Sequence, residues 1–322
     1  MTGSPVPDQP AALVTGGAGF LGSHLCEQLL ARGSRVTCLD NLSTGRLANI
    51  THLTAHPHFT YIEHDVTHPL PVRADFAAVF HLASPASPQD YSRLPVQTLL
   101  AGSVGTGHAL DLARSSGARF ILASSSEVYG DPLEHPQRES YRGNVDPCGP
   151  RSSYDEAKRF AEALTTAYRH EYGVSTAIAR IFNSYGPRMR SRDGRAMPTL
   201  ISQALHGDPL TVTGDGQQTR SFCYVTDTVA GLLALAGSGQ AGPVNIGSTC
   251  ELTILRLAGL IQEQAGTAAP VIFTPRPQQD PAVRRPDTTR ARTQLGWEPE
   301  IGLDVGIKAT ISWFASQANG DS

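Results

Sequence analysis

Lysine is rare in this chain, and one of its two lysines stands four residues after a tyrosine. The sequence has 24 arginines, and Lys158 follows Tyr154 in the segment SYDEAK at 153–158. A lysine ammonium is a compact charge whose pKa responds to burial, whereas arginine keeps its proton. Residues 153–172 are predicted to be helical, so the two side chains share a face and Lys158 can lower the pKa of the Tyr154 phenol. Such a phenol is a general base for a hydroxyl, although a surface Tyr/Lys pair has the same spacing.

A glycine-rich turn near the other end of the chain predicts a dinucleotide site. Gly16, Gly19 and Gly22 lie between a short apolar strand and an amphipathic helix, at GxxGxxG spacing. Glycines there let backbone amides approach a pyrophosphate at the helix N-terminus. We expect a dinucleotide to lie along this turn, in contact with Phe20 and Leu21 as well.

Two aspartates follow the next two predicted strands. Asp40 ends the strand at 35–39, 24 residues after Gly16. A carboxylate there accepts hydrogen bonds from the adenosine ribose and repels a 2′-phosphate, which favours NAD over NADP. Asp65, after the strand at 59–63, is a candidate partner for the adenine amino group, although an ordinary strand-end turn explains it as well.

Hydroxyls and one carboxylate follow the fifth predicted strand, 118–124. Ser125, Ser126 and Glu127 come at its end, and ligands of open α/β sheets lie beyond the carboxyl ends of the strands. Ser125 can therefore hydrogen-bond the same substrate oxygen as Tyr154. Ordinary turn and N-cap chemistry is the alternative explanation for the serines.

The elements that must position these residues alternate between strand and helix. This alternation predicts an α/β fold with a doubly wound parallel (Rossmann) sheet. The first two thirds give strands at 11–15, 35–39, 59–63, 76–82, 118–124 and 174–181, with helices at 20–32, 93–115 and 153–172. Later come strands at 210–213 and 243–246 and helices at 197–207, 226–238, 252–265 and 303–315.

The domain organisation follows from where the pattern loosens. We expect a disordered tail at 1–10, an NAD-binding domain at 11–182, and a smaller C-terminal α/β substrate-binding lobe over most of 183–322. Residues 226–246 are expected to be able to return a helix and a strand to the main sheet.

Composition excludes several classes of function. The net charge is −3 with no basic block, which argues against nucleic-acid binding. There is no apolar run of membrane-spanning length, and five scattered cysteines indicate buried free thiols in a reducing compartment, so we expect a soluble cytoplasmic protein. Histidines gather at 52–68, but Pro57 breaks any helix that would pair them and no ligand cluster joins them, so no metal site is predicted.

Several motifs together resemble the UDP-glucuronic acid decarboxylases (UDP-xylose synthases), within the extended short-chain dehydrogenase/reductase family of nucleotide-sugar enzymes. The resemblance runs from Leu13 to Phe314, and the run ASPASP at 83–88 is its most specific part. The carrying segments are TGGAGF at 15–20, DNLSTG at 40–45, HLASPASP at 81–88, SEVYGDP at 126–132, GPR at 149–151, ARIFN at 179–183, GPR at 186–188 and QTR at 218–220.

The resemblance implies roles for individual residues. Tyr154 is the base beside Lys158 and Ser125, while Ser126, Glu127 and Arg284 handle the carboxylate carbon. Further cofactor contacts are implied for Asn41, Ser43, Thr44, Gly45, Asp65, Val66, Leu82, Ala83 and Ser84. Substrate contacts are implied for Pro85, Tyr91, Asn183, Arg188, Val212, Gln217, Arg220 and Arg284. The chain departs from the family in having Ser125 where Thr is frequent, and in having Gly102 where the family usually has Asn near the cofactor.

The implied reaction is decarboxylation of a UDP- or dTDP-glucuronic acid to the nucleotide xylose, through a 4-keto intermediate, with NADH returning the hydride. Alternatives are release of the 4-keto pentose with NADH, a 4-epimerase, and a 4,6-dehydratase. A dehydratase normally has an Asp-Glu pair where this chain has Ser126-Glu127, and an epimerase needs no carboxylate there. A non-enzymatic NAD sensor would lack the Tyr154/Lys158 pair. The resemblance also implies a homodimer that pairs helices 93–115 and 153–172.

Overall fold

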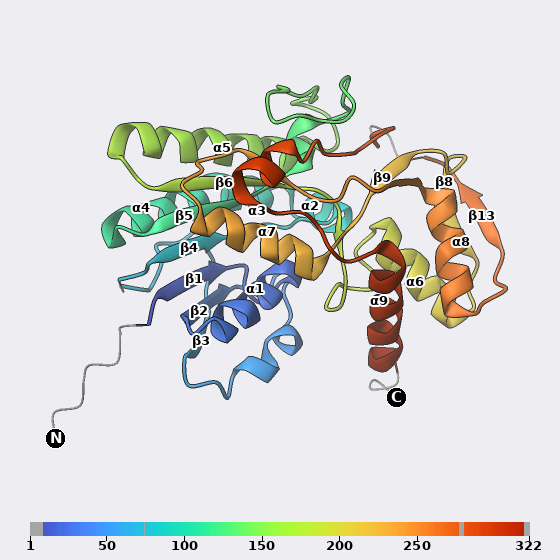
Figure 1. Cartoon of the computed structure of the whole chain (residues 1–322), viewed down its shortest axis with the longest axis horizontal. Coiled ribbons are helices and arrows are strands. Elements are labelled where there is room, and N and C mark those ends of the chain that lie inside the picture. Colours follow the sequence, from blue (N-terminus) through green and yellow to red (C-terminus); the bar gives the residue numbers. More distant parts are fainter. Residues whose placement is uncertain (1–8, 74, 277–279, 319–322) are drawn as a thin grey trace.

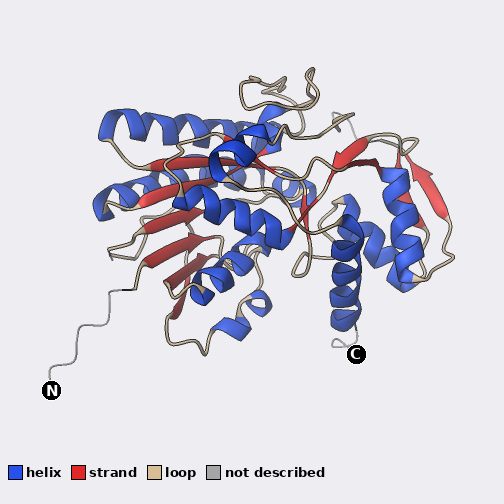
Figure 2. Cartoon of the chain, viewed as in Figure 1, coloured by secondary structure: helices blue, strands red, loops and turns tan. Residues whose placement is uncertain are grey.

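The computed structural model describes residues 9–73, 75–276 and 280–318, so the predicted tail at 1–10 lies almost wholly outside the described residues. Its centre is a seven-stranded parallel sheet in the order β11-β6-β5-β4-β1-β2-β3 (Figures 1 and 2). The doubly wound α/β fold class is therefore confirmed. The strands are β1 Ala11–Thr15, β2 Arg35–Asp40, β3 Phe59–Glu63, β4 Ala78–His81, β5 Arg119–Ser125, β6 Thr176–Ile181 and β11 Val244–Ile246.

Helices cover both faces of this sheet because the strand side chains alternate between two apolar cores. Val14, Cys38 and Ile121 point to one face, where they pack under α1 (Phe20–Ala31) and α7 (Val225–Gly237). Leu13, Phe120 and Ile178 belong to the core on the other face, under α4 (Thr106–Ser116) and α5 (Ser152–Tyr172). Both faces of a parallel sheet are thus buried, as such sheets require.

The helix predicted at 93–115 is one helical run with a wider turn in its middle. It consists of α3 (Pro95–Leu100), a π-helical turn (Ala101–Gly105) and α4. Gly102 lies in the wide turn, and a Cβ on it would come 2.7 Å from the Ala157 Cβ on α5. The glycine therefore lets this run approach α5 closely, one residue before Lys158. A short helix that the sequence did not predict, α2 (Pro88–Arg93), precedes it.

The C-terminal part builds a second core beside the sheet, yellow to red in Figure 1. Its helices are α6 (Ala196–His206), α8 (Ile254–Ala265) and α9 (Leu303–Ala318). Its strands form three two-stranded pairs: β8 (Leu210–Thr213) with β13 (Val271–Thr274), β9 (Thr219–Ser221) with β12 (Glu251–Thr253), and β7 (Ser184–Tyr185) with β10 (Cys223–Tyr224). Short 3₁₀ turns at Leu47–Asn49, Thr51–Leu53 and Ser126–Tyr129 and a π turn at Ala291–Leu295 complete the elements.

The chain returns to the main sheet after it has entered this lobe. β11 pairs in parallel with β6, matching Val244 with Ala179 and Ile246 with Ile181. The strand follows α7, which packs beside α1 on the sheet. The chain therefore passes between the sheet and the smaller lobe several times: after β6, before α7, after β11, and again on either side of Ala291–Leu295.

Two expectations from composition concern membrane-spanning segments and the burial of the cysteines. Among the described residues, no helix is both long enough and apolar enough to span a membrane. All five cysteines are free, but Cys148 and Cys250 are exposed, so the expectation of uniformly buried thiols is wrong. Both lie in loops outside the apolar cores, where no packing demands burial.

Candidate active site

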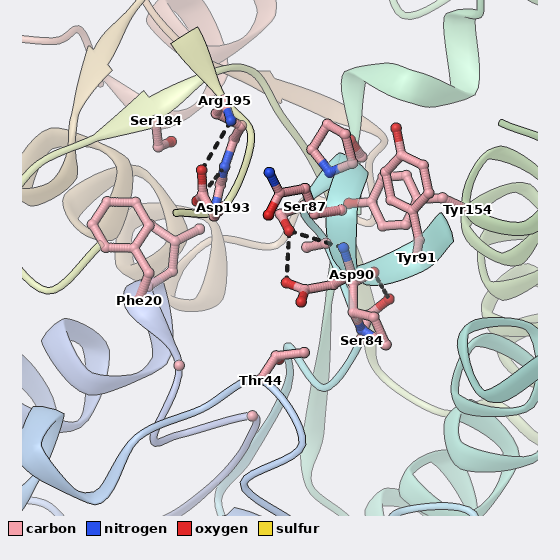
Figure 3. A pocket seen from close by; sticks show the side chains of 18 of the residues that line it. Phe20, Thr44, Ser84, Ser87, Asp90, Tyr91, Tyr154, Ser184, Asp193 and Arg195 are labelled. Atoms are coloured by element: carbon pink, nitrogen blue, oxygen red, sulfur yellow. Dashed lines mark hydrogen bonds and ion pairs between the residues drawn. The ribbon is translucent and has the colours of Figure 1, made fainter. Parts of the chain in front are cut away.

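A cavity of about 770 Å³ opens where the carboxyl ends of the strands face the smaller lobe. Nearly all predicted site residues line it, from both parts of the chain (Figure 3). From the cofactor set these are Gly16, Gly19, Phe20, Leu21, Gly22, Asp40, Asn41, Ser43, Thr44, Asp65, Val66, Leu82, Ala83 and Ser84. From the catalytic and substrate sets they are Tyr154, Lys158, Ser125, Ser126, Glu127, Arg284, Pro85, Tyr91, Asn183, Arg188 and Arg220.

Three predicted residues do not line the cavity. Val212 is fully buried in the core of the smaller lobe, and Gln217 is exposed. Their neighbours Thr211, Thr213 and Gln218 line the cavity instead. Side chains alternate between the two faces of β8, so Thr211 and Thr213 point to the cavity and Val212, between them, points to the core of the lobe. Gly45 lies behind the cavity wall.

The glycine turn has the shape that a dinucleotide pyrophosphate needs. Gly16 has φ +71°, and a Cβ on it would come 2.8 Å from the Ala83 amide nitrogen. A Cβ on Gly22 would overlap the Gly16 carbonyl oxygen. Side chains are thus excluded from the turn, which leaves its backbone amides and the start of α1 open to a phosphate.

Asp40 is fixed at the tip of β2. Its two carboxylate oxygens accept hydrogen bonds from the Ala18 amide, at 3.0 Å, and the Leu42 amide, at 2.8 Å. Gly45 packs against it, since a Cβ there would come 2.7 Å from Asp40 Oδ1. Asn41 Nδ2 donates to Asp65 Oδ2 at 2.9 Å, which joins the two predicted adenosine-side residues. The residues present therefore fit NAD.

Asp40→Ala is expected to relax the preference for NAD over NADP, because the carboxylate that repels a 2′-phosphate is gone. Roughly a 10-fold shift in the ratio of the two dissociation constants corresponds to about 1.4 kcal/mol of lost repulsion. Calorimetric titration of both cofactors measures the ratio, with Asp65→Ala as the comparison variant. An unchanged ratio in Asp40→Ala would remove this residue from the ribose site.

Tyr154 and Lys158 are both buried on the sheet side of α5. The Tyr154 ring stacks on the Tyr91 ring (Figure 3). The ring centroids are 5.1 Å apart and the planes differ by 13°. Lys158 Nζ donates to the Ala123 carbonyl at 2.9 Å and lies 5.6 Å from the centroid of the Tyr154 ring. The pair predicted from its spacing is thus assembled against the end of β5.

In this structure burial outweighs the effect that the sequence predicts for Lys158 on the pKa of the Tyr154 phenol. Burial raises the pKa of Tyr154 to about 12, and its hydrogen bond with the Ser125 hydroxyl offsets only part of this. Burial also lowers the pKa of Lys158 to about 8. The spacing argument assumed a solvated pair, whereas desolvation dominates both groups here.

Glu127 carries two arginines, of which the sequence predicted one. Arg284 donates to both carboxylate oxygens, and Arg151 Nη2 donates to Oε2 at 2.5 Å. Burial alone would raise the pKa of Glu127, but the two guanidinium charges hold it down at about 2. Glu127 is therefore ionised at neutral pH and is no proton donor.

The sequence analysis assigned no site role to Arg151, which lines the cavity, or to Asp155, which lies beside the Glu127 cluster. Arg151 precedes Tyr154 by one helical turn, which was the available signal. Asp155 is buried beside this cluster, where burial and then the charge of Glu127 raise its pKa to about 7. Arg151 lies in the quoted GPR segment at 149–151, but its contact with Glu127 and the burial of Asp155 depend on what packs around the start of α5.

The other cavity arginines each carry one carboxylate partner. Arg188, predicted for the diphosphate, donates to Glu27 on α1 at 2.5 Å, and Arg220 donates to Asp280 at 2.8 Å. Two further pairs were not predicted, Arg195 with Asp193 (Figure 3) and Arg190 with Asp90. Arginines in such pairs keep a fixed orientation and have further donors free for a phosphate.

Residues 12–247 match the model of the NAD-dependent epimerase/dehydratase family. The chain belongs to this family. It is 47% identical to UDP-glucuronic acid decarboxylase 1 of Xenopus tropicalis, over 96% of this chain and 73% of that protein. It is also 47% identical to UDP-glucuronic acid decarboxylase 3 of Arabidopsis thaliana, over 95% and 90%.

A solved structure extends the family comparison to bound ligands. UDP-glucuronic acid 4-epimerase from Bacillus cereus, in complex with UDP-glucuronic acid and NAD, superposes with a TM-score of 0.84 at 28% identity, over 95% of this chain and 99% of that one. The resemblance predicted from the sequence is confirmed, and so is NAD as the cofactor of the family.

Proposed function

We propose that this protein is an NAD-dependent decarboxylase that converts a nucleoside-diphosphate glucuronic acid to the corresponding xylose. The observation that carries the proposal is that the Tyr154 phenol and the Glu127–Arg284–Arg151 cluster line one cavity together with the dinucleotide turn. A base and a carboxylate-handling cluster in one site support chemistry at adjacent carbons of one sugar. The similarity to UDP-glucuronic acid decarboxylases over almost the whole chain supports the same substrate class.

In the proposed mechanism, bound NAD supplies the acceptor, and later the donor, of the hydride at carbon 4. The phenolate form of Tyr154, which the Lys158 ammonium beside it favours, takes the proton of the 4-hydroxyl, and Ser125 hydrogen-bonds the same oxygen. The resulting ketone lies β to the carboxylate, so the bond to the carboxyl carbon can break with its electrons moving into an enolate. Tyr154 and Ser125 stabilise that enolate until carbon 5 takes a proton from water, and Tyr154 then returns its proton to the 4-oxygen as the hydride comes back. Arg284 and Arg151 orient the carboxylate that leaves as carbon dioxide.

The state of Glu127 favours decarboxylation over its rivals. A 4,6-dehydratase needs an acid and a base at carbons 5 and 6, whereas Ser126 is no acid and the pKa of Glu127 is held at about 2. A departing carboxylate supplies its own electron pair, so neither is required. A 4-epimerase acts only at carbon 4, so it needs no group that promotes release of the carboxylate.

Product analysis tests the proposal. The protein is incubated with NAD and either UDP-glucuronic acid or dTDP-glucuronic acid, and the products are identified by mass. We expect a nucleotide pentose without net NADH, and the faster substrate identifies the nucleotide. A product of unchanged mass would indicate an epimerase, and a 4-keto pentose with equimolar NADH would replace the redox-neutral reaction with an oxidative one.

We propose that the protein is a homodimer formed through α3 and α5. Large apolar side chains are exposed along the helical run, at Val96, Leu99, Leu100 and Val104, and Phe160 is 51% exposed on α5. Contiguous exposed apolar surface of this kind is typical of protein interfaces. Because α3 packs against α5, a two-fold pairing of these helices with those of a second copy would bury the exposed apolar side chains in a four-helix arrangement.

Phe160→Asp is expected to give a monomer, because it places a charge at the centre of this surface. Light scattering after size exclusion measures the mass, with Phe273→Asp, at a side chain 56% exposed on β13, as the matched control. A wild-type protein that is monomeric at all concentrations would contradict the proposal.

We place the protein in the cytoplasm. Its five cysteines are all free, including the exposed Cys148 and Cys250. Exposed free thiols persist in a reducing compartment.

A further inference from the structure

One buried ion pair beside the site has no part in the mechanism above. Glu162 lies on α5, four residues after Lys158, and accepts hydrogen bonds from Arg180 Nε at 2.9 Å and Nη2 at 2.7 Å. Ser124 Oγ donates to the same carboxylate at 2.6 Å. The two charged side chains are only 13% and 12% exposed. A buried pair with this many hydrogen bonds fixes geometry more than it adds stability.

The pair anchors α5 to the ends of three strands. Ser124 belongs to β5 and Arg180 to β6, and Arg180 Nη1 also donates to the Tyr129 hydroxyl at 3.0 Å. Tyr129 in turn donates to Asn245 Oδ1 on β11 at 2.8 Å. The helix that carries Tyr154 is thus held in one position relative to the strand ends that form the cavity wall.

Glu162 also lies on the same face of α5 as Tyr154 and Lys158. Tyr154, Lys158 and Glu162 follow at four-residue spacing on one face of α5. Lys158 Nζ donates to the carbonyl of Ala123, and Ser124, the next residue, donates to Glu162, so Lys158 and Glu162 are both tied to the end of β5.

We propose that Glu162 and Arg180 are positioning residues of the active site: the Glu162 carboxylate, held by Arg180 and Ser124, keeps Lys158 protonated and in place beside Tyr154. This inference rests on the proposed function only in taking Tyr154 and Lys158 as the working pair.

The charges around Lys158 support this assignment. Burial lowers the pKa of Lys158 to about 8, and the charge of Glu162 opposes that fall. His81 on β4 also faces the ammonium, but burial and the charge of Lys158 lower its pKa to about 3, so it is neutral. In the free protein Tyr154 adds no negative charge either, because burial raises the pKa of its phenol to about 12. Among the described groups facing Lys158, Glu162 is therefore the one whose charge favours the ammonium.

Because the chain has only two lysines, the protonation of Lys158 can be followed directly by NMR. The full chain is labelled with ¹³C at the lysine ε-carbons, which gives two NMR signals, from Lys158 and from the exposed Lys308 on α9. Glu162→Gln is expected to lower the titration midpoint of Lys158 by roughly 1 unit or more, because an opposite charge nearby is lost. Lys308 should not move and serves as the internal reference.

Two further variants make the outcome decisive. Glu156→Gln removes a carboxylate from the same helix that pairs with Arg159 at 3.6 Å and should leave the Lys158 midpoint unchanged. Arg180→Gln should raise the midpoint, since Glu162 loses the guanidinium that neutralises it. If Glu162→Gln does not fold, the upward shift of the Lys158 midpoint in Arg180→Gln is sufficient to test the proposal. A midpoint that stays within error of the wild type would overturn the proposal.

Kinetics provide a second readout. In Glu162→Gln the alkaline limb of the pH–rate profile of NAD reduction should move to lower pH, in step with the NMR midpoint. A uniform loss of rate at every pH, with no shift, would show a purely structural role and would also overturn the proposal. Because the NMR titration contains no sugar nucleotide, its result does not depend on whether the decarboxylation itself is correct.

Discussion

Tyr154→Phe is expected to lower the rate of NAD reduction by nucleotide-glucuronate by roughly 10²–10⁴-fold, the usual contribution of a positioned general base. The change removes the hydroxyl and keeps the ring that stacks on Tyr91. NAD affinity should be unchanged, because it rests on Gly16, Gly19 and Asp40. Single-turnover absorbance of NADH gives the rate, and calorimetry gives the cofactor affinity.

Tyr168→Phe is the matched control for this variant. Tyr168 lies on the same helix but outside the cavity, where its hydroxyl donates to Asp111 at 2.9 Å. It should lose little activity. Near-normal turnover in Tyr154→Phe would remove Tyr154 from the role of base.

Glu127→Gln is expected to separate oxidation from decarboxylation. Oxidation at carbon 4 needs Tyr154, Lys158 and Ser125, so NAD should still be reduced on addition of substrate. Pentose formation should fall by roughly 10²–10³-fold, the loss typical when one preorganised polar group is removed. The physical reason is that Arg284 and Arg151 lose the carboxylate that fixes both of them. The keto acid or its decarboxylated ketone should then accumulate.

Stopped-flow absorbance of NADH combined with mass analysis of the products measures both steps of the Glu127→Gln reaction. Glu156→Gln, on the exposed side of α5, controls for loss of a carboxylate elsewhere. Parallel loss of NADH and pentose in Glu127→Gln would show that Glu127 acts in binding or oxidation instead.

The parts of the site that the sequence predicted are those that local structure determines. The glycine turn and Asp40 lie within one strand-turn-helix unit, so spacing along the chain fixes their arrangement in space. Tyr154 and Lys158 are predictable for the same reason, because one turn of helix separates them. The parallel sheet is predictable from the strand–helix alternation, whereas the order of its strands is not.

The parts that the sequence missed depend on contacts between distant segments. Arg151 and Glu127 are 24 residues apart, and Arg180 meets Glu162 only because β6 lies under α5. The strands β9 and β12 have three residues each, too few to show a period. Val212, implied as a substrate contact, is instead buried in the core of the smaller lobe. The sequence could not predict that burial outweighs Lys158 in setting the pKa of Tyr154, because burial, unlike spacing, is set by the whole fold.

An isotope transfer experiment tests the central claim most directly. UDP-glucuronic acid carrying deuterium at carbon 4 is converted by the protein with unlabelled NAD, and products are analysed by mass and NMR. Internal return of the hydride predicts UDP-xylose that retains the deuterium at carbon 4, with no labelled NADH released. Deuterium found in free NADH beside an unlabelled 4-keto pentose, or in a six-carbon product, would contradict the account.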